Sequence, residues 1–416
     1  MMKKTLLIIG ILIIIGAVVF LVLGQKPQDE EGDNRVGFSI RDYLPFGKND
    51  EDINQDLFDE YLNNQTDIGS DSQNYLNYGP VPKLRKVSEE PVAGAVVFNI
   101  GTTSVVRFVE KGTGNVYEVK SDSNRVDRLT NTTIPKIIRA FWLPDGSGFL
   151  AQTLLSNTET IETSFVELKK SISTSTYDSV PFDTTISQLP TGIKEISISP
   201  KGSKVFYYTT SNSGSEWFIA NPDGTKEELV YSHPLTEWLP KWISANVVAI
   251  QTKSSSESVG VGYLFDLKNQ KLEKIVETIG LSFNTNSESA SLISRGGSSS
   301  ELLLNKNNEF TELNIKTLAD KCVWLNENKE EFSAFCAVPE EMPRGNYPDI
   351  WYQGIVFTND VIEKIEIHSG ISRKIVDLTD ESGEKIDVVD IAISPDNTHT
   401  IFRNKIDGYL WILRLD

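Results

Sequence analysis

The sequence predicts an all-β protein: a seven-bladed β-propeller that follows an N-terminal transmembrane helix and a disordered acidic linker. Three features predict it. A unit of short strands and polar turns recurs six times between Phe141 and Asp416, an uncharged apolar run covers Thr5 to Gly24, and a polar stretch lies between them. Repeats of about 40–50 residues with four strands are typical of propeller blades. We therefore expect a cytoplasmic N-terminus at 1–4, a signal anchor at 5–24, a linker at 25–82 and the propeller at 83–416.

The apolar run at 5–24 is long enough to cross a membrane. An α-helix rises about 1.5 Å per residue, so about twenty residues span the ~30 Å hydrocarbon core. Lys3 and Lys4 precede the run and an acidic group beginning at Asp29 follows it, so the positive-inside rule places the propeller outside the membrane. The alternative is a cleaved signal peptide, whose apolar region is shorter and ends in a small-x-small site that is absent here.

The linker at 25–82 is rich in Asp, Asn, Gln and Gly, a composition that cannot bury enough apolar surface to fold alone. Two apolar islands interrupt it, at 38–47 and 52–63, and the second places its apolar residues on one face if it is helical. Either island docks a partner or folds back on the propeller, or the second is a transient helix. The acidic residues at 50–56 fit a calcium loop poorly, because Gln55 and Tyr61 replace its glycine and closing glutamate.

Each repeat begins with a strand, a tight turn and a second strand. Pro144-Asp145-Gly146 and Pro200-Lys201-Gly202 form two of these turns; proline presets φ there and glycine tolerates positive φ. We expect equivalent positions at the end of the first strand in Trp142, Ile198, Trp242, Phe283, Trp324 and Ile393.

The blade count depends on how the ring closes. Four strands between Ala93 and Leu129 form an additional unit, the last unit stops at Asp416 without a fourth strand, and a spare strand lies at Lys83–Val87. If the last blade takes its outer strand from the N-terminal end, the spare strand supplies the missing fourth strand and no sheet edge is left open. This closure predicts seven blades, with six or eight as alternatives.

The segments 198–205, 217–224 and 393–397 resemble the repeats of TolB-type propellers. The resemblance covers roughly 83–416 and consists of turn and strand signals. With the anchor, the two cysteines and the 348–354 segment, the chain is similar to bacterial membrane-anchored propeller proteins. TolB-type propellers are mostly protein-binding modules, and three units lack the Ser-Pro-Asp-Gly turn. The resemblance therefore implies a fold and a side of the membrane, and it implies no activity.

Cys322 and Cys336 flank a predicted hairpin. If its turn centres near Asn328, the two cysteines lie opposite each other on adjacent strands, and an exported compartment lets them form a disulfide. The alternative is a pair of buried free thiols. No metal site is expected, because two thiols and three scattered histidines do not form a ligand set.

A proline-rich stretch at 338–352 extends one repeat well beyond the others. Long loops on rigid scaffolds often bind partners, and this one carries residue types favoured at interface hot spots. The candidate binding residues are Arg344, Tyr347, Trp351 and Tyr352. In the alternative interpretation, the last two fill the gap between neighbouring blades while the prolines shape the detour.

The composition bears on function mainly by exclusion. A net charge of -18 argues against nucleic acid as a partner. The chain has no Gly-x-Ser-x-Gly, His-Glu-x-x-His or phosphate-loop motif, so no catalytic residue or cofactor is expected. We expect a non-catalytic, extracytoplasmic module that presents one propeller face to a protein or cell-wall glycan. The alternative is a hydrolase or lyase that acts on glycan or peptide in the central funnel, using carboxylates from several blades.

Overall fold

The computed structural model describes residues 80–416, apart from 156–159, 172–179, 254, 299, 326–331, 368 and 416. The predicted anchor at 5–24, the two linker islands and the calcium-like stretch lie outside these residues. Within the described part of the chain, no helix has the length and apolar character needed to cross a bilayer.

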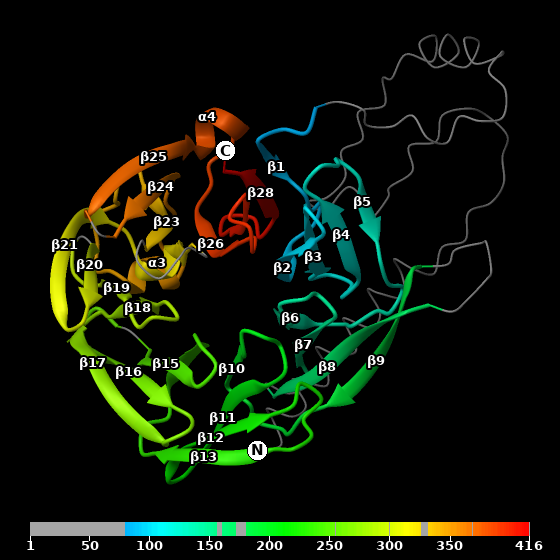
Figure 1. Cartoon of the computed structure of the whole chain (residues 1–416), viewed down its shortest axis with the longest axis horizontal. Coiled ribbons are helices and arrows are strands. Elements are labelled where there is room, and N and C mark those ends of the chain that lie inside the picture. Colours follow the sequence, from blue (N-terminus) through cyan, green and yellow to red (C-terminus); the bar gives the residue numbers. More distant parts are fainter. Residues whose placement is uncertain are drawn as a thin grey trace, which may run out of the picture. The chain divides into compact units, whose positions relative to one another are not determined.

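The described residues form seven antiparallel sheets of four strands arranged around a centre (Figure 1). Blade 1 contains β2 (Val92–Ile100), β3 (Thr103–Glu110), β4 (Val116–Lys120) and β5 (Val126–Arg128). Blade 2 contains β6 (Ile137–Trp142), β7 (Gly148–Leu154), β8 (Ile161–Lys170) and β9 (Phe182–Gln188). Blade 3 contains β10 (Glu195–Ile198), β11 (Val205–Ser211), β12 (Gly214–Ala220) and β13 (Glu228–His233).

The second half of the ring repeats this order. Blade 4 contains β14 (Trp238–Trp242), β15 (Val247–Thr252), β16 (Val259–Asp266) and β17 (Lys271–Ile279). Blade 5 contains β18 (Ser282–Thr285), β19 (Ser291–Ser294), β20 (Glu301–Lys306) and β21 (Glu309–Lys316). Blade 6 contains β22 (Cys322–Trp324), β23 (Ser333–Pro339), β24 (Asp360–Glu366) and β25 (Ile371–Asp377). Blade 7 contains β26 (Val388–Ile393), β27 (His399–Asn404), β28 (Leu410–Arg414) and β1 (Leu84–Lys86).

The ring closes by pairing the two ends of the propeller, as the sequence predicts. Strand β1 lies antiparallel to β28, with Leu84 opposite Leu413 and Lys86 opposite Trp411. The backbone N–H of Val87 continues the ladder to the carbonyl of Leu410 at 2.8 Å. The seven-bladed count and the N-terminal origin of the last outer strand are therefore confirmed.

One of the six predicted equivalent positions is wrong. After each of the other first strands, the next residue donates its N–H across the turn, as Leu143 does to Gly148 and Leu325 to Ser333. In blade 5 this donor is Asn286, so the equivalent residue is Thr285 and not Phe283. The turn of blade 5 lacks the proline that marks the register in blades 2, 3 and 7. A shift of two residues keeps the same face of the strand inward, so hydrophobicity alone does not reveal it.

The hydrophobic core consists of layers between neighbouring blades. Between blades 3 and 4, for example, Trp217 packs edge-on against Trp238, 5.2 Å between ring centroids, and against Phe265 at 5.3 Å. The first strands lie near the centre and the fourth strands along the outside (Figure 1). Because the core is between the blades, the inner edges of the first strands remain free to line a central channel.

Short helices lie at the connections. They are η2 (Ala319–Lys321), α3 (Asp349–Tyr352) and α4 (Leu378–Ser382). In a four-stranded meander, the turn between the second and third strands and the connection to the next blade lie at the same end. All three helices therefore belong to one face of the propeller, here called the upper face.

Candidate functional site

A cavity of about 520 Å³ lies at the inner edges of blades 4 to 7 and is here called the channel cavity. It is lined by residues of β14, β15, β18, β26 and β27, together with residues of η2, β22 and α3. Because α3 and the turn after β27 are on the upper face, the cavity opens there. Its polar side chains are Lys241, Gln251, Asn284, Asp320, Tyr352, Asp390, Arg403, Asn404 and Lys405.

The insertion at 340–359, between β23 and β24, positions α3 over the channel cavity. Its backbone pairs with blade 5, where Tyr347 and Gly297 exchange hydrogen bonds of 2.9 and 3.1 Å. Its Asp349 accepts hydrogen bonds from the Ser256 hydroxyl at 2.8 Å and the Ser256 N–H at 3.0 Å, in blade 4. A Cβ at Gly296 would stand 2.7 Å from the Tyr347 carbonyl, so this close approach requires glycine. The insertion is thus tied to the two blades that precede its own.

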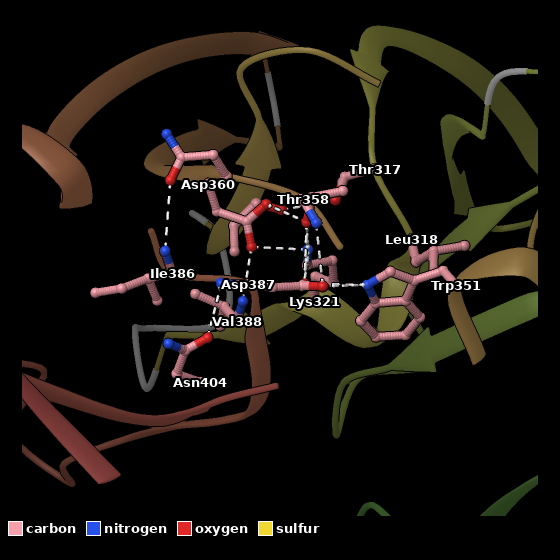
Figure 2. A network of polar contacts seen from close by, with 12 residues as sticks. Thr317, Leu318, Lys321, Trp351, Thr358, Asp360, Ile386, Asp387, Val388 and Asn404 are labelled. Atoms are coloured by element: carbon pink, nitrogen blue, oxygen red, sulfur yellow. Dashed lines mark hydrogen bonds and ion pairs between the residues drawn. The ribbon is translucent and has the colours of Figure 1, made fainter. Parts of the chain in front are cut away.

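A buried ionic network attaches the insertion to blade 7 (Figure 2). The Lys321 ammonium donates to Asp360 at 2.7 Å and to Asp387 at 2.8 Å. It also lies over the Trp351 ring, 5.1 Å from its centroid. The Trp351 indole N–H donates to both carboxylate oxygens of Asp387, at 3.0 and 2.9 Å, and the Thr358 N–H reaches the same carboxylate at 3.2 Å. Burial raises the pKa of Asp360, and Asp387 raises it further, while Lys321 opposes the shift.

The channel cavity holds a second, open group of titratable side chains. The Tyr352 hydroxyl donates to the Asp320 carboxylate, and the Asp320 N–H donates to the Ser282 hydroxyl at 3.2 Å. The Lys241 ammonium donates to the Asn284 Oδ1 at 2.7 Å. The Asn284 amide in turn donates to the Cys322 carbonyl at 2.7 Å, which holds its oxygen toward Lys241.

The pKa values of this group are displaced by desolvation. Lys241 is exposed to the channel, but the protein groups around its ammonium partly desolvate it. This desolvation lowers the pKa of Lys241 to about 8, and the attraction of Asp320 opposes the shift. Desolvation raises the pKa of Asp320, and the Tyr352 hydrogen bond partly opposes the rise. The pKa of Tyr352 is raised well above its usual value by desolvation and by Asp320.

The other charged residues of the channel cavity are engaged with partners of their own. Arg403 pairs with Asp390, through its Nε at 2.7 Å. Lys405 lies 4.8 Å from the ring centroids of both Trp351 and Phe357 and donates to the Trp351 carbonyl. Burial lowers the pKa of Lys405.

Gln251 carries an unused acceptor in the same cavity. Its side chain is 6% exposed, and its Oε1 has no hydrogen-bond partner among the described residues. It lies on β15 opposite Leu239 of β14, and Leu239 is two residues before Lys241 on that strand. Side chains two residues apart share one face of a sheet, so Gln251 and Lys241 are on the same face of blade 4.

The four predicted binding residues fall in two environments. Tyr347 is fully buried, and its hydroxyl donates to the Pro343 carbonyl at 2.8 Å. Trp351 is 4% exposed and belongs to the network of Figure 2. Arg344 is exposed on the insertion, while Tyr352 is 41% exposed and lines the channel cavity. Of the four, Trp351 and Tyr352 reach the cavity.

The structure also shows how the two cysteines are paired and how the potential metal ligands are arranged. Cys322 and Cys336 are directly opposite on β22 and β23, 4.0 Å between their Cα atoms, and form a disulfide. Cys322 also lines the channel cavity. In the portion that the structure describes, no group of three His, Cys, Asp or Glu is arranged to hold a metal ion.

No sequence motif marks Lys241, Gln251, Asp320 or Arg403, and only the first two come from the same repeat. One signal was present in the sequence. The residue that precedes the last position of each first strand is Asn99, Phe141, Ser197, Lys241, Asn284, Val323 or Ala392. Lys241 is the charged member of this set, and a charge on an innermost strand points to a solvated channel.

Comparisons with known proteins support the fold. No protein-family model matches the sequence, and no curated protein matches it. Among solved structures, the chain is similar to an oligogalacturonate lyase in complex with manganese, with a TM-score of 0.51 and 10% identity over 82% of this chain and 95% of that one. It is similar to the oligogalacturonate lyase of Vibrio parahaemolyticus, with a TM-score of 0.51 and 10% identity over 84% of this chain and 96% of that one.

The seven-bladed propeller fits the expected resemblance to TolB-type propellers. A putative TolB from Agrobacterium tumefaciens is among the similar structures, with 14% identity over 42% of this chain and 62% of that one and a TM-score of 0.31. At these identities the similarity shows a propeller fold and carries no activity to this chain.

Proposed function

We propose that this protein is a membrane-anchored, extracytoplasmic binding module whose ligand site is the channel cavity. The proposal rests on one observation: the cavity has polar groups with hydrogen-bonding capacity that a ligand can use. Gln251 has an unused buried acceptor, and Lys241 is bonded to a neutral amide rather than to a carboxylate. Buried polar groups are normally satisfied, so unpartnered groups around an open cavity favour binding there.

The rigidity of the surroundings supports this function. The insertion that carries Tyr352 is fixed by backbone pairing with blade 5 and by the buried network with blade 7. A site whose residues are already held in place loses little entropy when it binds. Anchoring at 5–24 raises the local concentration of the site near the membrane. The disulfide between Cys322 and Cys336 is consistent with an oxidising compartment outside it.

Site-specific photocrosslinking in intact membranes tests the binding function. A benzoylphenylalanine replaces Tyr352 in the full-length protein, and a matched control carries it at Lys271, an exposed position on the outer strand β17. We expect a discrete adduct from position 352 and none from position 271. Identical adducts from both positions, or none from 352, would contradict a ligand site in the channel cavity.

A lyase or hydrolase is the second candidate function. It is favoured by Lys241, whose pKa of about 8 suits a proton acceptor, beside the Tyr352–Asp320 pair. Incubation with uronate oligosaccharides and with peptides between pH 7 and 9 tests it. New unsaturated or hydrolysed products that disappear in Lys241→Met would establish catalysis and replace the binding function.

A further inference from the structure

The ligand chemistry can be read from the charges of the channel cavity. Three basic residues line it, Lys241, Arg403 and Lys405, and two acidic ones, Asp320 and Asp390. The chain as a whole carries a net charge of -18. A locally basic cavity in an acidic protein attracts anions, because opposite charge concentrates a ligand at the site.

Among these cations, Lys241 has room for an anionic partner. Arg403 is already paired with Asp390, and Lys405 is held by two aromatic rings and a carbonyl. Lys241 donates to the neutral Asn284, while the nearest carboxyl, Asp320, is hydrogen-bonded to Tyr352. A carboxylate that reached Lys241 would form a charge-assisted hydrogen bond in a partly desolvated site, where such bonds are strongest.

Beside Lys241, the site offers an acceptor. The Gln251 Oε1 is buried and unpartnered, and Gln251 shares a sheet face with Lys241 on the adjacent strand. It complements an N–H donor close to the anionic group. A carboxylate with an N–H donor one bond from its α-carbon is the end of a peptide chain.

Apolar side chains line the same cavity as these polar groups. Among them are Leu239, Phe283 and Ile391, from blades 4, 5 and 7. This surface suits aliphatic and aromatic side chains.

We propose that the channel cavity binds the carboxyl end of a peptide: the terminal carboxylate on Lys241, the terminal N–H on the Gln251 Oε1, and an apolar side chain against Leu239, Phe283 and Ile391. The inference rests on the proposed function and assigns its ligand class. It also explains why the cavity retains a buried acceptor and an unpaired cation that the fold itself does not use.

Peptide capture in two matched forms tests the inference. The probes are an N-acetylated hexapeptide library with free carboxyl ends and the same library with amidated ends, applied to the full-length protein in detergent. We expect capture of free-ended peptides with apolar final residues. Amidation and Lys241→Met should each weaken binding about ten- to hundredfold, as expected for loss of a charge-assisted hydrogen bond. Lys241→Arg should retain binding, and Lys271→Met is the control.

The outcomes separate the inference from the function on which it rests. Equal capture of free and amidated peptides would overturn the carboxylate role while leaving a peptide site. Capture of uronate oligosaccharides but not of peptides, in a parallel array, would overturn the peptide class. No capture of either, together with a discrete adduct from position 352, would overturn the inference but leave the binding function. No capture and no adduct would overturn both. Thermal unfolding of Lys241→Met shows whether a loss reflects binding or folding.

Discussion

Two groups of charged side chains, one around Lys321 and one around Asp320, differ in almost every respect, although these two residues are adjacent in η2. Lys321 enters the core between blades 6 and 7, where Asp360, Asp387 and Thr358 surround its ammonium within 2.8 Å (Figure 2). Asp320, one residue earlier, faces the channel cavity with Tyr352. The buried group is satisfied and closed, whereas the open group keeps unused hydrogen-bonding capacity. Ionic groups of similar composition thus stabilise the fold in one place and leave hydrogen-bonding capacity unused in the other.

The largest expected effect is the loss of Lys321. Lys321→Met leaves two buried carboxylates without their cation and weakens the network that attaches the insertion to blade 7. Removing one partner of a buried ionic group typically costs about 3–5 kcal/mol. Urea unfolding should show this loss, and Lys241→Met in the channel, as the matched control, should change stability by less than about 1 kcal/mol. Similar losses in both variants would break the distinction between the two groups.

The disulfide is expected to have the next largest effect. It joins residues that are 14 apart in the sequence and begins at the residue after Lys321. Crosslinks that close loops of about this length contribute roughly 3 kcal/mol, largely by restricting the unfolded chain. The double variant Cys322→Ala/Cys336→Ala should therefore unfold at lower urea and still bind the same ligand. Loss of binding in a variant that remains folded would show that the disulfide shapes the channel cavity as well.

The sequence predicts features that depend on neighbouring residues, and it does not predict contacts between residues far apart in the chain. Blades, turns and ring closure depend on local patterns such as Pro144-Asp145-Gly146 and on the spare strand at the N-terminus, and they were predicted. The shift from Phe283 to Thr285 was missed because strand periodicity of two does not distinguish them. The role of Trp351 depends on Asp387, 36 residues later in another blade. Neither the local sequence pattern nor the composition predicts the hydrogen bond between Trp351 and Asp387.

A titration of Lys241 tests the open group directly. Its pKa is expected at about 8 by NMR of methylated lysines. The groups that face it are Asp320, Tyr352, Asp390, Arg403 and Lys405. Asp320→Asn removes an attraction that raises the pKa of Lys241, so its pKa should fall further.

The sign of the corresponding pH dependence follows from the lowered pKa. Between the folded-state pKa of about 8 and the model-peptide value of about 10.5, the unfolded chain holds a proton that the folded protein has lost. Folding stability relative to Lys241→Met should therefore rise as the pH increases through this window. Channel water screens the effect, so we expect less than about 1 kcal/mol. A relative fall in stability over the same window would contradict the lowered pKa.

The smallest effect on stability is expected at Gln251, and it is the sharpest test of the comparison. Gln251→Met removes a buried acceptor that has no partner, so the fold should lose nothing and gain up to about 1 kcal/mol. The matched variant Asn284→Leu removes an amide whose nitrogen donates to two carbonyls, at 3.1 and 2.7 Å, and should be destabilising. If Gln251→Met is stable but captures free-ended peptides more weakly, the acceptor is retained for recognition. If it is destabilising, Gln251 belongs to the fold, and the open group is smaller than the cavity suggests.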